Sequence, residues 1–324
     1  MTYLRTREAQ LGLAILALLV LVASRFAAFV EPANLARVLN DTAPLILLAL
    51  GQTVVILTRC IDLSVAANLA LTGMVCAMAN VAMPGLPVPV IMLGAAVMGG
   101  LLGAFNGVLV WKLAIPPIVV TLGTLTIYRG LVFVISGGAW INAHEFTPAF
   151  TALPRATLLG LPLMAWIALA GVAAFAALVR YAPLGRAFYA VGGNPSAAVY
   201  AGIDPGRTQF AAFVISGAVS GLTGYLWVAR YQVAYVDIAG GFELEVVAAC
   251  VIGGISIAGG AGTILGALLG ALFLGIIKNA LPVVNISPFW QLAISGAAIV
   301  IAVALNTRAT RKPGRIILKR AEAP

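Results

Sequence analysis

The chain has 324 residues, of which 62% are hydrophobic and only 9% are charged, and its mean hydropathy is +1.08. Because a soluble domain carries about 25% charged residues, this composition excludes a protein whose whole surface lies in water. The net charge of +9 does not indicate nucleic-acid binding. The basic residues stand singly in short loops or in the tail after Asn306, as they do in membrane proteins.

Ten apolar runs follow one another along the chain. A backbone in lipid must satisfy its hydrogen bonds internally, so each run is predicted to be helical. We therefore predict an all-α, polytopic integral membrane protein with about ten transmembrane helices. The first run also resembles the core of a signal peptide, but the nine runs after it favour an uncleaved span. The predicted spans are residues 10–30, 43–58, 63–83, 88–111, 115–136, 157–179, 208–228, 244–258, 262–283 and 288–306.

The basic residues predict which loops lie in the cytoplasm. With the N-terminus inside, the cytoplasmic segments hold 13 Lys and Arg residues and the external segments hold 4, which is the positive-inside asymmetry. We therefore place both termini in the cytoplasm. Residues 1–306 form a single transmembrane domain with a cytoplasmic loop at 180–207, and residues 307–324 form a basic cytoplasmic tail. The internal basic residues are Arg5, Arg7, Arg59, Lys112, Arg180, Arg186, Arg207 and six in the tail, and the external ones are Arg37, Arg155, Arg230 and Lys278.

Two short sequences occur twice, five spans apart. Residues 61–67 at the start of the third span are echoed by residues 242–248 at the start of the eighth, and residues 101–104 are echoed by 268–271. Because five is odd, the two halves would cross the membrane in opposite directions, as in the inverted repeats of many transporters. Chance similarity between helices rich in Ala, Leu and Gly is the alternative.

Glycines recur at every fourth residue in two spans, which predicts close approach of neighbouring helices and no chemistry. The pairs Gly253-Gly254 and Gly259-Gly260 predict a break near the cytoplasmic end of the eighth span. The sequence 259–263 is not a nucleotide-binding loop, because it lacks the Lys-Ser/Thr ending and a preceding strand. The two glycine trios are Gly99, Gly103, Gly107 and Gly262, Gly266, Gly270.

The loop after the sixth span predicts a short, capped helix. Asn194 is a helix-capping residue and Pro195 suits the first helical position. Residues 196–201 supply about two turns, and Gly202 suits the left-handed closing position. The small residues of this helix and Tyr200 are suited to a partner's groove, although an ordinary interfacial helix is the alternative.

A few polar residues within or beside the spans are candidates for a solute pathway. Asp62 complements the dipole of the third span as a cap or takes part in transport. Arg129 within the fifth span is either functional or a structural arginine bonded to carbonyl groups. No chain of buried acids is present, which counts against a proton-driven pump. The pathway candidates are Gln52, Asp62, Asn68, Asn106, Thr121, Thr124, Thr126 and Arg129.

Metal and disulfide sites are not indicated. The three cysteines, Cys60, Cys76 and Cys250, have no Cys-x-x-Cys spacing, and His144 is the one histidine, so a zinc site and a disulfide framework are both unsupported.

Four motifs together carry a resemblance to a known family, over roughly residues 35–306. The motifs are 51–58 with Ile61-Asp-Leu-Ser-Val65, 115–124 with Arg129-Gly130, 185–195 and 251–262. With these motifs the chain resembles the permease subunits of bacterial ribose/xylose/rhamnose-type ABC sugar importers. The resemblance implies a dimeric channel in the inner membrane, cytoplasmic ATPase subunits, a periplasmic sugar-binding protein and a coupling helix at 192–202 that docks on the ATPase. The implied ATPase-coupling residues are Arg186, Gly192, Gly193, Asn194, Pro195, Ala197, Ala198 and Gly202.

One departure from the family bears on the substrate and the dimer. The family commonly has two glycines before Ile-Asp-Leu-Ser, whereas this chain has Arg59 and Cys60. Residues 59–68 look most similar to the rhamnose branch, whose systems resemble pairs of unlike permeases. Rhamnose is therefore the favoured sugar, and both a homodimer and a heterodimer remain open.

These observations predict a permease subunit of an ATP-driven monosaccharide importer, with no covalent chemistry and no cofactor in this chain. ATP and Mg²⁺ would bind the partner ATPase. The external loops 31–42, 137–156 and 229–243 would meet the binding protein, through Arg37, Arg155 and Arg230 if these are not interfacial anchors. The alternative is a self-standing secondary carrier, which would need coupling-ion sites at broken helices. An intramembrane enzyme is excluded by the lack of a nucleophile–base pair.

Overall fold

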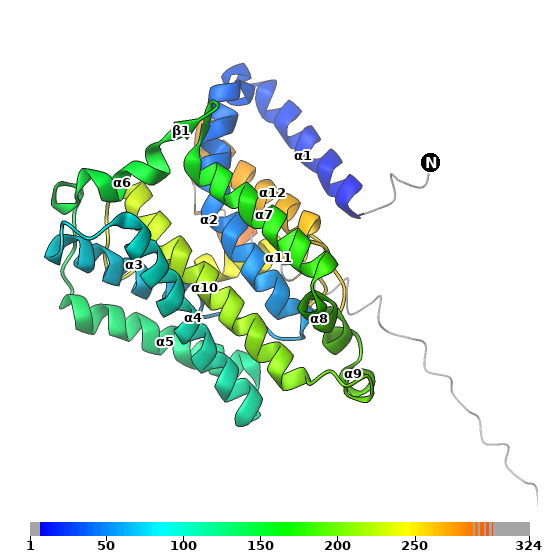
Figure 1. Cartoon of the computed structure of the whole chain (residues 1–324). Helices are drawn as coiled ribbons and strands as arrows, with labels where there is room; N and C mark the ends of the chain where they lie inside the picture. Colours follow the sequence, from blue (N-terminus) through cyan, green and yellow to red (C-terminus); the bar gives the residue numbers. More distant parts are fainter. Residues whose placement is uncertain (1–6, 288, 291, 295, 298–299, 301–324) are drawn as a thin grey trace, which may run out of the picture.

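A computed structural model of the chain describes residues 7–287, 289–290, 292–294, 296–297 and 300. The described elements are helices apart from one two-stranded hairpin (Figure 1). In chain order they are α1 (Arg7–Ala23), η2 (Ala27–Val30), α2 (Pro32–Leu57), α3 (Val65–Ala82), α4 (Val88–Lys112), α5 (Pro117–Ser136), η3 (Ala143–Glu145), α6 (Pro148–Arg155), β1 (Thr157–Leu158), β2 (Leu161–Pro162), α7 (Leu163–Tyr181), α8 (Pro183–Gly193), α9 (Pro195–Tyr200), α10 (Pro205–Tyr231), α11 (Phe242–Ile252) and α12 (Ile264–Val283).

The all-α, polytopic fold predicted from the sequence is confirmed, whereas the number of ten spans is not. Within the described part of the chain, seven helices are long and apolar enough to cross a membrane: α2, α3, α4, α5, α7, α10 and α12. The predicted first and eighth spans are shorter, because α1 has 17 residues and α11 has 11. The predicted tenth span, 288–306, lies largely outside the described residues.

Two predicted boundaries were wrong for local reasons. Helix α2 begins at Pro32, well before residue 43, because Pro32 suits the first turn and the polar residues that follow find partners on α10. The predicted sixth span starts six residues too early, because residues 157–162 form the β1–β2 hairpin. Leu159 and Gly160 both have positive φ in its two-residue turn, as a tight hairpin turn of the primed type requires.

Helix α10 is the centre of the packing and lies between α4, α3 and α2 (Figure 1). A Cβ added to Gly99 or Gly103 would meet backbone atoms of Gly217 on α10. Gly266 and Gly270 of α12 similarly leave no room for a Cβ against Gly253 and Ala249. The predicted close approach is thus confirmed for Gly99, Gly103, Gly266 and Gly270, whereas Gly262 lies in the loop before α12. Where lipid supplies no hydrophobic drive between helices, such close contact provides van der Waals packing.

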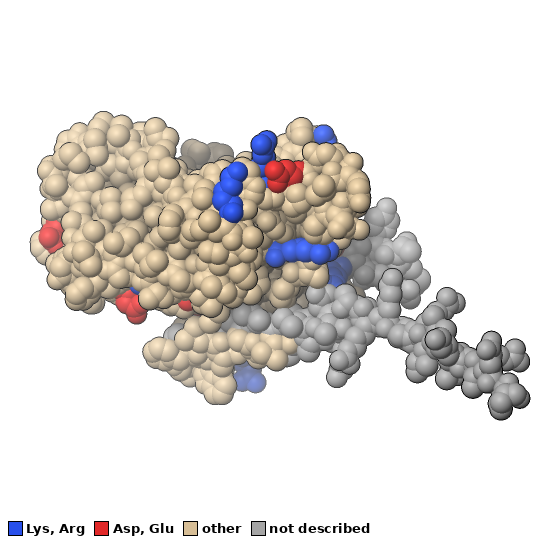
Figure 2. All heavy atoms as spheres, turned by 90° about the horizontal axis from the view of Figure 1, so that it is seen from below, with Lys and Arg blue, Asp and Glu red and all other residues tan. Residues whose placement is uncertain are grey.

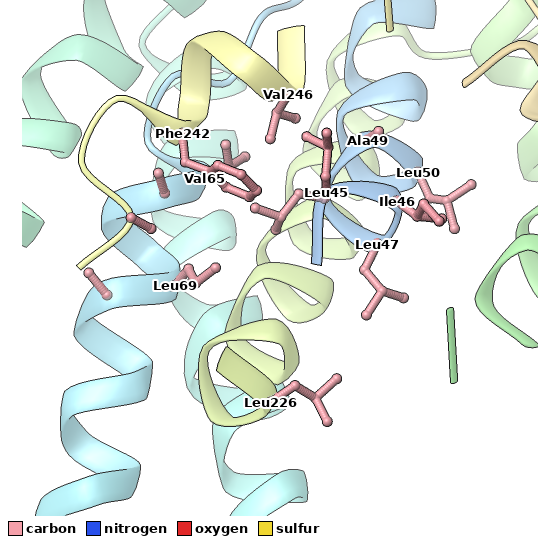
Figure 3. Close-up of a cluster of buried hydrophobic side chains, with 14 of the residues drawn as sticks. Leu45, Ile46, Leu47, Ala49, Leu50, Val65, Leu69, Leu226, Phe242 and Val246 are labelled. Atoms are coloured by element: carbon pink, nitrogen blue, oxygen red, sulfur yellow. The ribbon is translucent and has the colours of Figure 1, made fainter. Parts of the chain in front are cut away.

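The largest apolar core surrounds α2. Side chains of α2, α3, α10 and α11 converge there, with Leu226 of α10 and Phe242 of α11 among those in Figure 3. In the most apolar stretch of α2, 89% of the residues are buried, whereas the corresponding shares are 28% for α4 and α5 and 22% for α7. The outer helices therefore expose apolar side chains to a lipid environment, and α2 is enclosed by protein.

Helices α2 and α10 run in opposite directions. Gln209 Nε2 near the start of α10 donates to Thr58 O at the end of α2 over 3.2 Å, and Arg230 near the end of α10 reaches Asp41 of α2. Helices α3 and α11, which begin with the repeated sequence, enter the bundle from opposite ends. The pairing of α10 with α4 also has a counterpart in the pairing of α2 with α12. This arrangement of the described helices agrees with an inverted repeat, while the count of five spans in each half stays a prediction.

Candidate functional site

The segment after α7 forms the capped helix that the sequence predicts. The side-chain oxygen of Asn194 accepts a hydrogen bond from Ala197 N over 3.1 Å, and Pro195 takes the first position of α9. Gly202 has a φ of +77°, which suits glycine in the left-handed closing position. The caps therefore fix a six-residue helix that would be too short to be stable by itself.

The exposed surface of α9 differs from the one that small residues alone suggested. Tyr200 is 93% exposed and Val199 is 57% exposed, whereas Ala198 is only 3% exposed and faces the bundle. Gly193 has open space beside its Cα, and Gly192 is packed against Leu57 O and Gly260 N. Of the eight predicted coupling residues, Gly192 and Ala198 are buried within the chain, Pro195 is half-buried, and Arg186, Gly193, Asn194, Ala197 and Gly202 are exposed.

Three segments meet beside α9 at a junction formed by residues 57–60, 192–193 and 259–262. Gly260 N donates to Leu57 O over 3.0 Å. The Arg59 side chain donates from Nε to Gly192 O over 2.7 Å and from Nη2 to Gly193 O over 2.9 Å. Tyr189 of α8 donates its hydroxyl to Gly262 O over 2.7 Å. The predicted glycine break thus serves as a packing surface for the end of α8.

Arg59 has a φ of +65°, in the left-handed region that favours glycine. A non-glycine residue there costs about 1–3 kcal/mol. Hydrogen bonds from a charged group are each worth about 1.5–3 kcal/mol at buried sites and less where water screens them. The two carbonyl contacts of Arg59 are of a size to offset the backbone strain, which accounts for an arginine at a position where glycine is expected.

A polar cluster lies next to this junction, at the start of α3. Asp62 is 2% exposed, and its carboxylate accepts hydrogen bonds from Ser64 N (2.9 Å) and Ser64 Oγ (2.6 Å). Asn106 of α4 donates to Ser64 Oγ over 2.8 Å, and the Gln52 amide, in the orientation that satisfies both partners, pairs with the backbone of Asp62. Burial raises the pKa of Asp62 to about 6. Its contacts with Ser64 hold a turn just before α3, whose N-cap residue is Ser64 and which has no side-chain cap.

The other pathway candidates on α3 and α5 join separate helices. Asn68 Nδ2 donates to Gly99 O over 3.1 Å, and Thr121 Oγ1 donates to Ile61 O over 3.2 Å. Gln52, Asp62, Asn68, Asn106, Thr121 and Thr124 are all buried, whereas Thr126 is exposed and bonds within α5. Among the described residues, Asn68 Oδ1, Asn106 Oδ1 and Ser216 Oγ are buried without a hydrogen-bond partner.

These candidates line neither of two cavities that the structure contains. One, of about 250 Å³, is apolar and lies between α3 and α4, beside Cys76 and Met98. The other, of about 390 Å³, lies between Arg7, Glu8 and the loop 253–263. In the described part of the chain, His, Cys, Asp and Glu side chains do not gather in a group that could hold a metal ion.

Arg129 is hydrogen-bonded to backbone carbonyl groups. Of the functional and structural roles that the sequence left open for it, these contacts favour the structural one. Its Nη1 donates to Ile238 O over 2.5 Å and lies 4.0 Å from Asp237 Oδ1. It therefore attaches the loop between α10 and α11 to α5, and this contact does not involve a solute.

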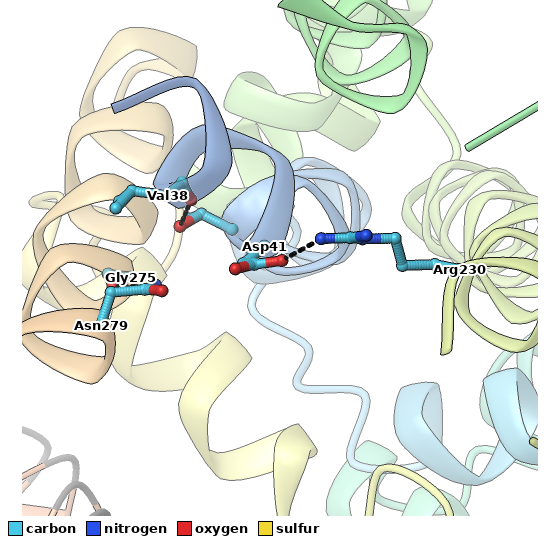
Figure 4. Close-up of polar contacts among 6 residues, drawn as sticks. Val38, Asp41, Arg230, Gly275 and Asn279 are labelled. Carbon is cyan, nitrogen blue, oxygen red and sulfur yellow. Dashed lines mark hydrogen bonds and ion pairs between the residues drawn. The ribbon is translucent and has the colours of Figure 1, made fainter. Parts of the chain in front are cut away.

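Ion pairs at the same end of the bundle were missed by sequence reasoning. Arg230 of α10 lies 2.7 Å from Asp41 of α2, and Lys278 of α12 lies 3.5 Å from Glu245 of α11. Figure 4 shows Arg230 reaching across to Asp41. Arg230, for which the sequence left a binding-protein contact or an interfacial anchor open, has its guanidinium paired within the chain.

Charge is distributed unevenly between the two ends of the molecule. Figure 2 shows one face from below: most of the blue side chains lie right of the middle with one red group among them, and the other red groups lie toward the left. The end that carries α9 holds Arg7, Arg59, Lys112, Arg180, Arg186 and Arg207.

Comparison with known proteins assigns the family. The family described as "branched-chain amino acid transport system / permease component" matches residues 34–303. The chain belongs to this permease family. It is 38% identical over 309 residues to the autoinducer 2 import system permease protein LsrC of Enterobacter sp. (strain 638), covering 95% of this chain and 88% of that protein.

Other relatives carry the same name. The LsrC proteins of Klebsiella pneumoniae and Salmonella typhi are 36% and 37% identical, over 95% and 90% of this chain and 88% and 82% of their own lengths. No solved structure matches the chain. The chain is thus a membrane-embedded permease component, and these relatives are named as autoinducer 2 import permeases, not as rhamnose permeases.

Proposed function

We propose that this chain is the transmembrane subunit of an ATP-driven importer, and that α9 is the helix on which a separate ATPase subunit docks. The observation that carries the proposal is the exposure of Tyr200 and Val199 on a doubly capped helix beside the junction. We define the docking surface as Gly193, Ala197, Val199 and Tyr200. An exposed aromatic side chain on a rigid support is a typical anchor of a protein interface.

The charge distribution supports the orientation. The end with α9 holds six described basic residues, whereas the described acids near it are the half-buried Glu8 and the exposed Asp204. Cytoplasmic segments carry such an excess of Lys and Arg. The docking surface then faces the cytosol, both termini lie in the cytoplasm of a bacterial inner membrane, and the loops around Asp237 and Glu145 face a periplasmic binding protein.

The substrate proposed for this chain is autoinducer 2, because the relatives that cover most of its length are named as autoinducer 2 import permeases. Rhamnose, which the local resemblance at 59–68 favours, is the competing substrate. The buried amides and hydroxyls of Asn68, Asn106 and Ser216, whose acceptor atoms have no partner in the described chain, suit a hydroxylated solute if the bundle opens at α3, α4 and α10.

The partners follow from this function. The chain would pair with a second copy or a similar permease, and ATP and Mg²⁺ would bind the ATPase subunit. No catalytic residue and no cofactor are assigned to this chain. Motion of α9 would switch the bundle between outward and inward opening.

Reconstitution tests the proposal. The chain, its ATPase and the periplasmic protein encoded beside it are placed in proteoliposomes, and uptake of autoinducer 2 and of L-rhamnose is measured separately. Uptake that requires all components and ATP supports the proposal, and the accumulated compound identifies the substrate. Uptake by the chain alone, driven by an ion gradient, would establish a secondary carrier instead.

A further inference from the structure

The turn between α8 and α9 leaves a carbonyl group without its helical donor. In a continuous helix Gly193 O would accept from the N–H four residues later, which belongs to Ala197. That N–H is donated to Asn194 Oδ1 over 3.1 Å. Arg59 supplies the missing donor from 134 residues away in the sequence, with Nη2 at 2.9 Å from Gly193 O, and its Nε bonds the neighbouring Gly192 O.

The backbone around Arg59 is held in place on its other sides. Leu57 O accepts from Gly260 N over 3.0 Å, and Thr58 O accepts from Gln209 Nε2 over 3.2 Å. A Cβ on Gly259 would collide with the Arg59 side chain, so the glycine loop packs directly on it. The Arg59 guanidinium therefore binds the end of α8. The main chain just before Arg59 is hydrogen-bonded to Gly260 in the loop after α11 and to Gln209 of α10.

Arg59 is also three residues from the polar cluster at the start of α3. Ile61 O accepts from Thr121 of α5 over 3.2 Å, and Asp62 is joined through Ser64 to Asn106 of α4. A continuous path thus runs from the last carbonyls of α8, through the Arg59 side chain and the covalent backbone of residues 59–64, to hydrogen bonds with α4 and α5. Such a connected set of contacts can couple two sites when both bias the same movable element.

We propose that Arg59 is the positioning residue that transmits displacement of α9 to the α2–α3 junction and hence to the buried polar cluster at Asp62. The inference rests on the proposed function, because the displacement comes from the docked ATPase. Arg59 acts through the α8 carbonyls and touches neither nucleotide nor solute.

The test replaces Arg59 by glycine and by lysine. Glycine accepts the left-handed φ without strain, so Arg59→Gly removes the guanidinium but leaves a favourable backbone. Arg59→Lys keeps the charge with one flexible ammonium in place of the two-pronged contact. Arg180→Ala is the matched control, because it removes one exposed positive charge from the same end of the molecule and Arg180 is outside the docking surface. Each variant is reconstituted with the ATPase and the binding protein, using autoinducer 2 as the probe.

Three quantities are measured for each variant: affinity for the ATPase, the rate of ATP hydrolysis, and solute moved per ATP hydrolysed. We expect Arg59→Gly to retain ATPase affinity and to lose about tenfold in solute moved per ATP, within the usual range of coupling between sites. Arg59→Lys should lie between Arg59→Gly and the wild type, and Arg180→Ala should match the wild type.

Two results would overturn the inference. In one, Arg59→Gly transports with the wild-type ratio. In the other, Arg59→Gly loses ATPase affinity and transport in proportion, which would make Arg59 a structural support for docking alone. Failure of the proposed function would look different, because the wild-type chain itself would bind no ATPase.

Discussion

The guanidinium of Arg230 on α10 lies 2.7 Å from the carboxylate of Asp41 on α2, at the opposite end of these two helices from the contact between Gln209 and Thr58. The two antiparallel helices at the centre of the bundle are therefore joined at both ends by polar contacts. Separating α2 from α10 at the Arg230 end would break an ion pair. Separating them at the Gln209 end would break a hydrogen bond between a side-chain amide and a backbone carbonyl.

The Arg230–Asp41 pair is expected to stabilise the fold measurably. Its side chains are 27% and 34% exposed, so partial burial strengthens the pair and residual water screens it. A double-mutant cycle with Arg230→Ala and Asp41→Ala should give a coupling free energy of about 1 kcal/mol, measured from thermal unfolding in detergent. The Arg207–Asp204 pair, at 3.4 Å and 76% and 46% exposed, is the matched control and should give less than about 0.5 kcal/mol. Equal values for both pairs would contradict this prediction.

Close contact between α4 and α10 depends on glycine at position 103. Gly103→Ala places a methyl group against Phe213 O and the Gly217 Cα, and we expect a loss of about 1–3 kcal/mol from overpacking. Gly94→Ala on the same helix adds the same methyl group where no atom lies within 4 Å. Thermal unfolding should therefore show a lower midpoint for Gly103→Ala and no decrease for Gly94→Ala. Similar midpoints for the two variants would argue against the packing seen between these helices.

The carboxyl group of Asp62 predicts a particular pH dependence of stability. Burial raises its pKa from 3.8 to about 6 in the folded protein. Below pH 3.8 the Asp62 carboxyl group is protonated in both the folded and the unfolded state, so its burial does not lower the free energy of unfolding. As the pH rises from 3.8 toward 6, the unfolded chain loses this proton before the folded protein does, so the free energy of unfolding falls, by on the order of 2 to 3 kcal/mol once the pH is above both values.

The variant Asp62→Asn tests this dependence, because its amide oxygen can still accept from Ser64. Unfolding of the wild type should become easier between pH 4 and pH 6, and the variant should lack this part of the slope. An unchanged slope in Asp62→Asn would assign the titration to another group.

Features encoded by neighbouring residues could be predicted from the sequence. The cap at Asn194, the proline at 195 and the glycine at 202 lie within nine residues of one another, and the structure has each of them in the predicted role. The glycine repeat of α4 is local in the same way, because four-residue spacing puts Gly99, Gly103 and Gly107 on one helix face.

Features that depend on distant partners could not be predicted. Arg59 and Gly192 are 133 residues apart, and Asp41 and Arg230 are 189 residues apart. Asp41 looked like a loop residue because nothing nearby in the sequence shows that its charge is paired inside a helix. Ala198 was assigned to a partner surface because composition reveals a small residue and not the direction it faces.

The docking role of α9 is tested most directly by the affinity of the chain for its ATPase, measured with the full chain in nanodiscs. Tyr200→Ala removes a side chain that is 93% exposed, and Gly193→Trp fills open space, so neither should disturb the fold. Leu159→Ala, which truncates an 86% exposed residue at the opposite end, is the control. The account predicts that both α9 variants lose at least about tenfold in affinity, or 1.4 kcal/mol, while the control binds as the wild type does. Wild-type affinity in Tyr200→Ala and Gly193→Trp would contradict it.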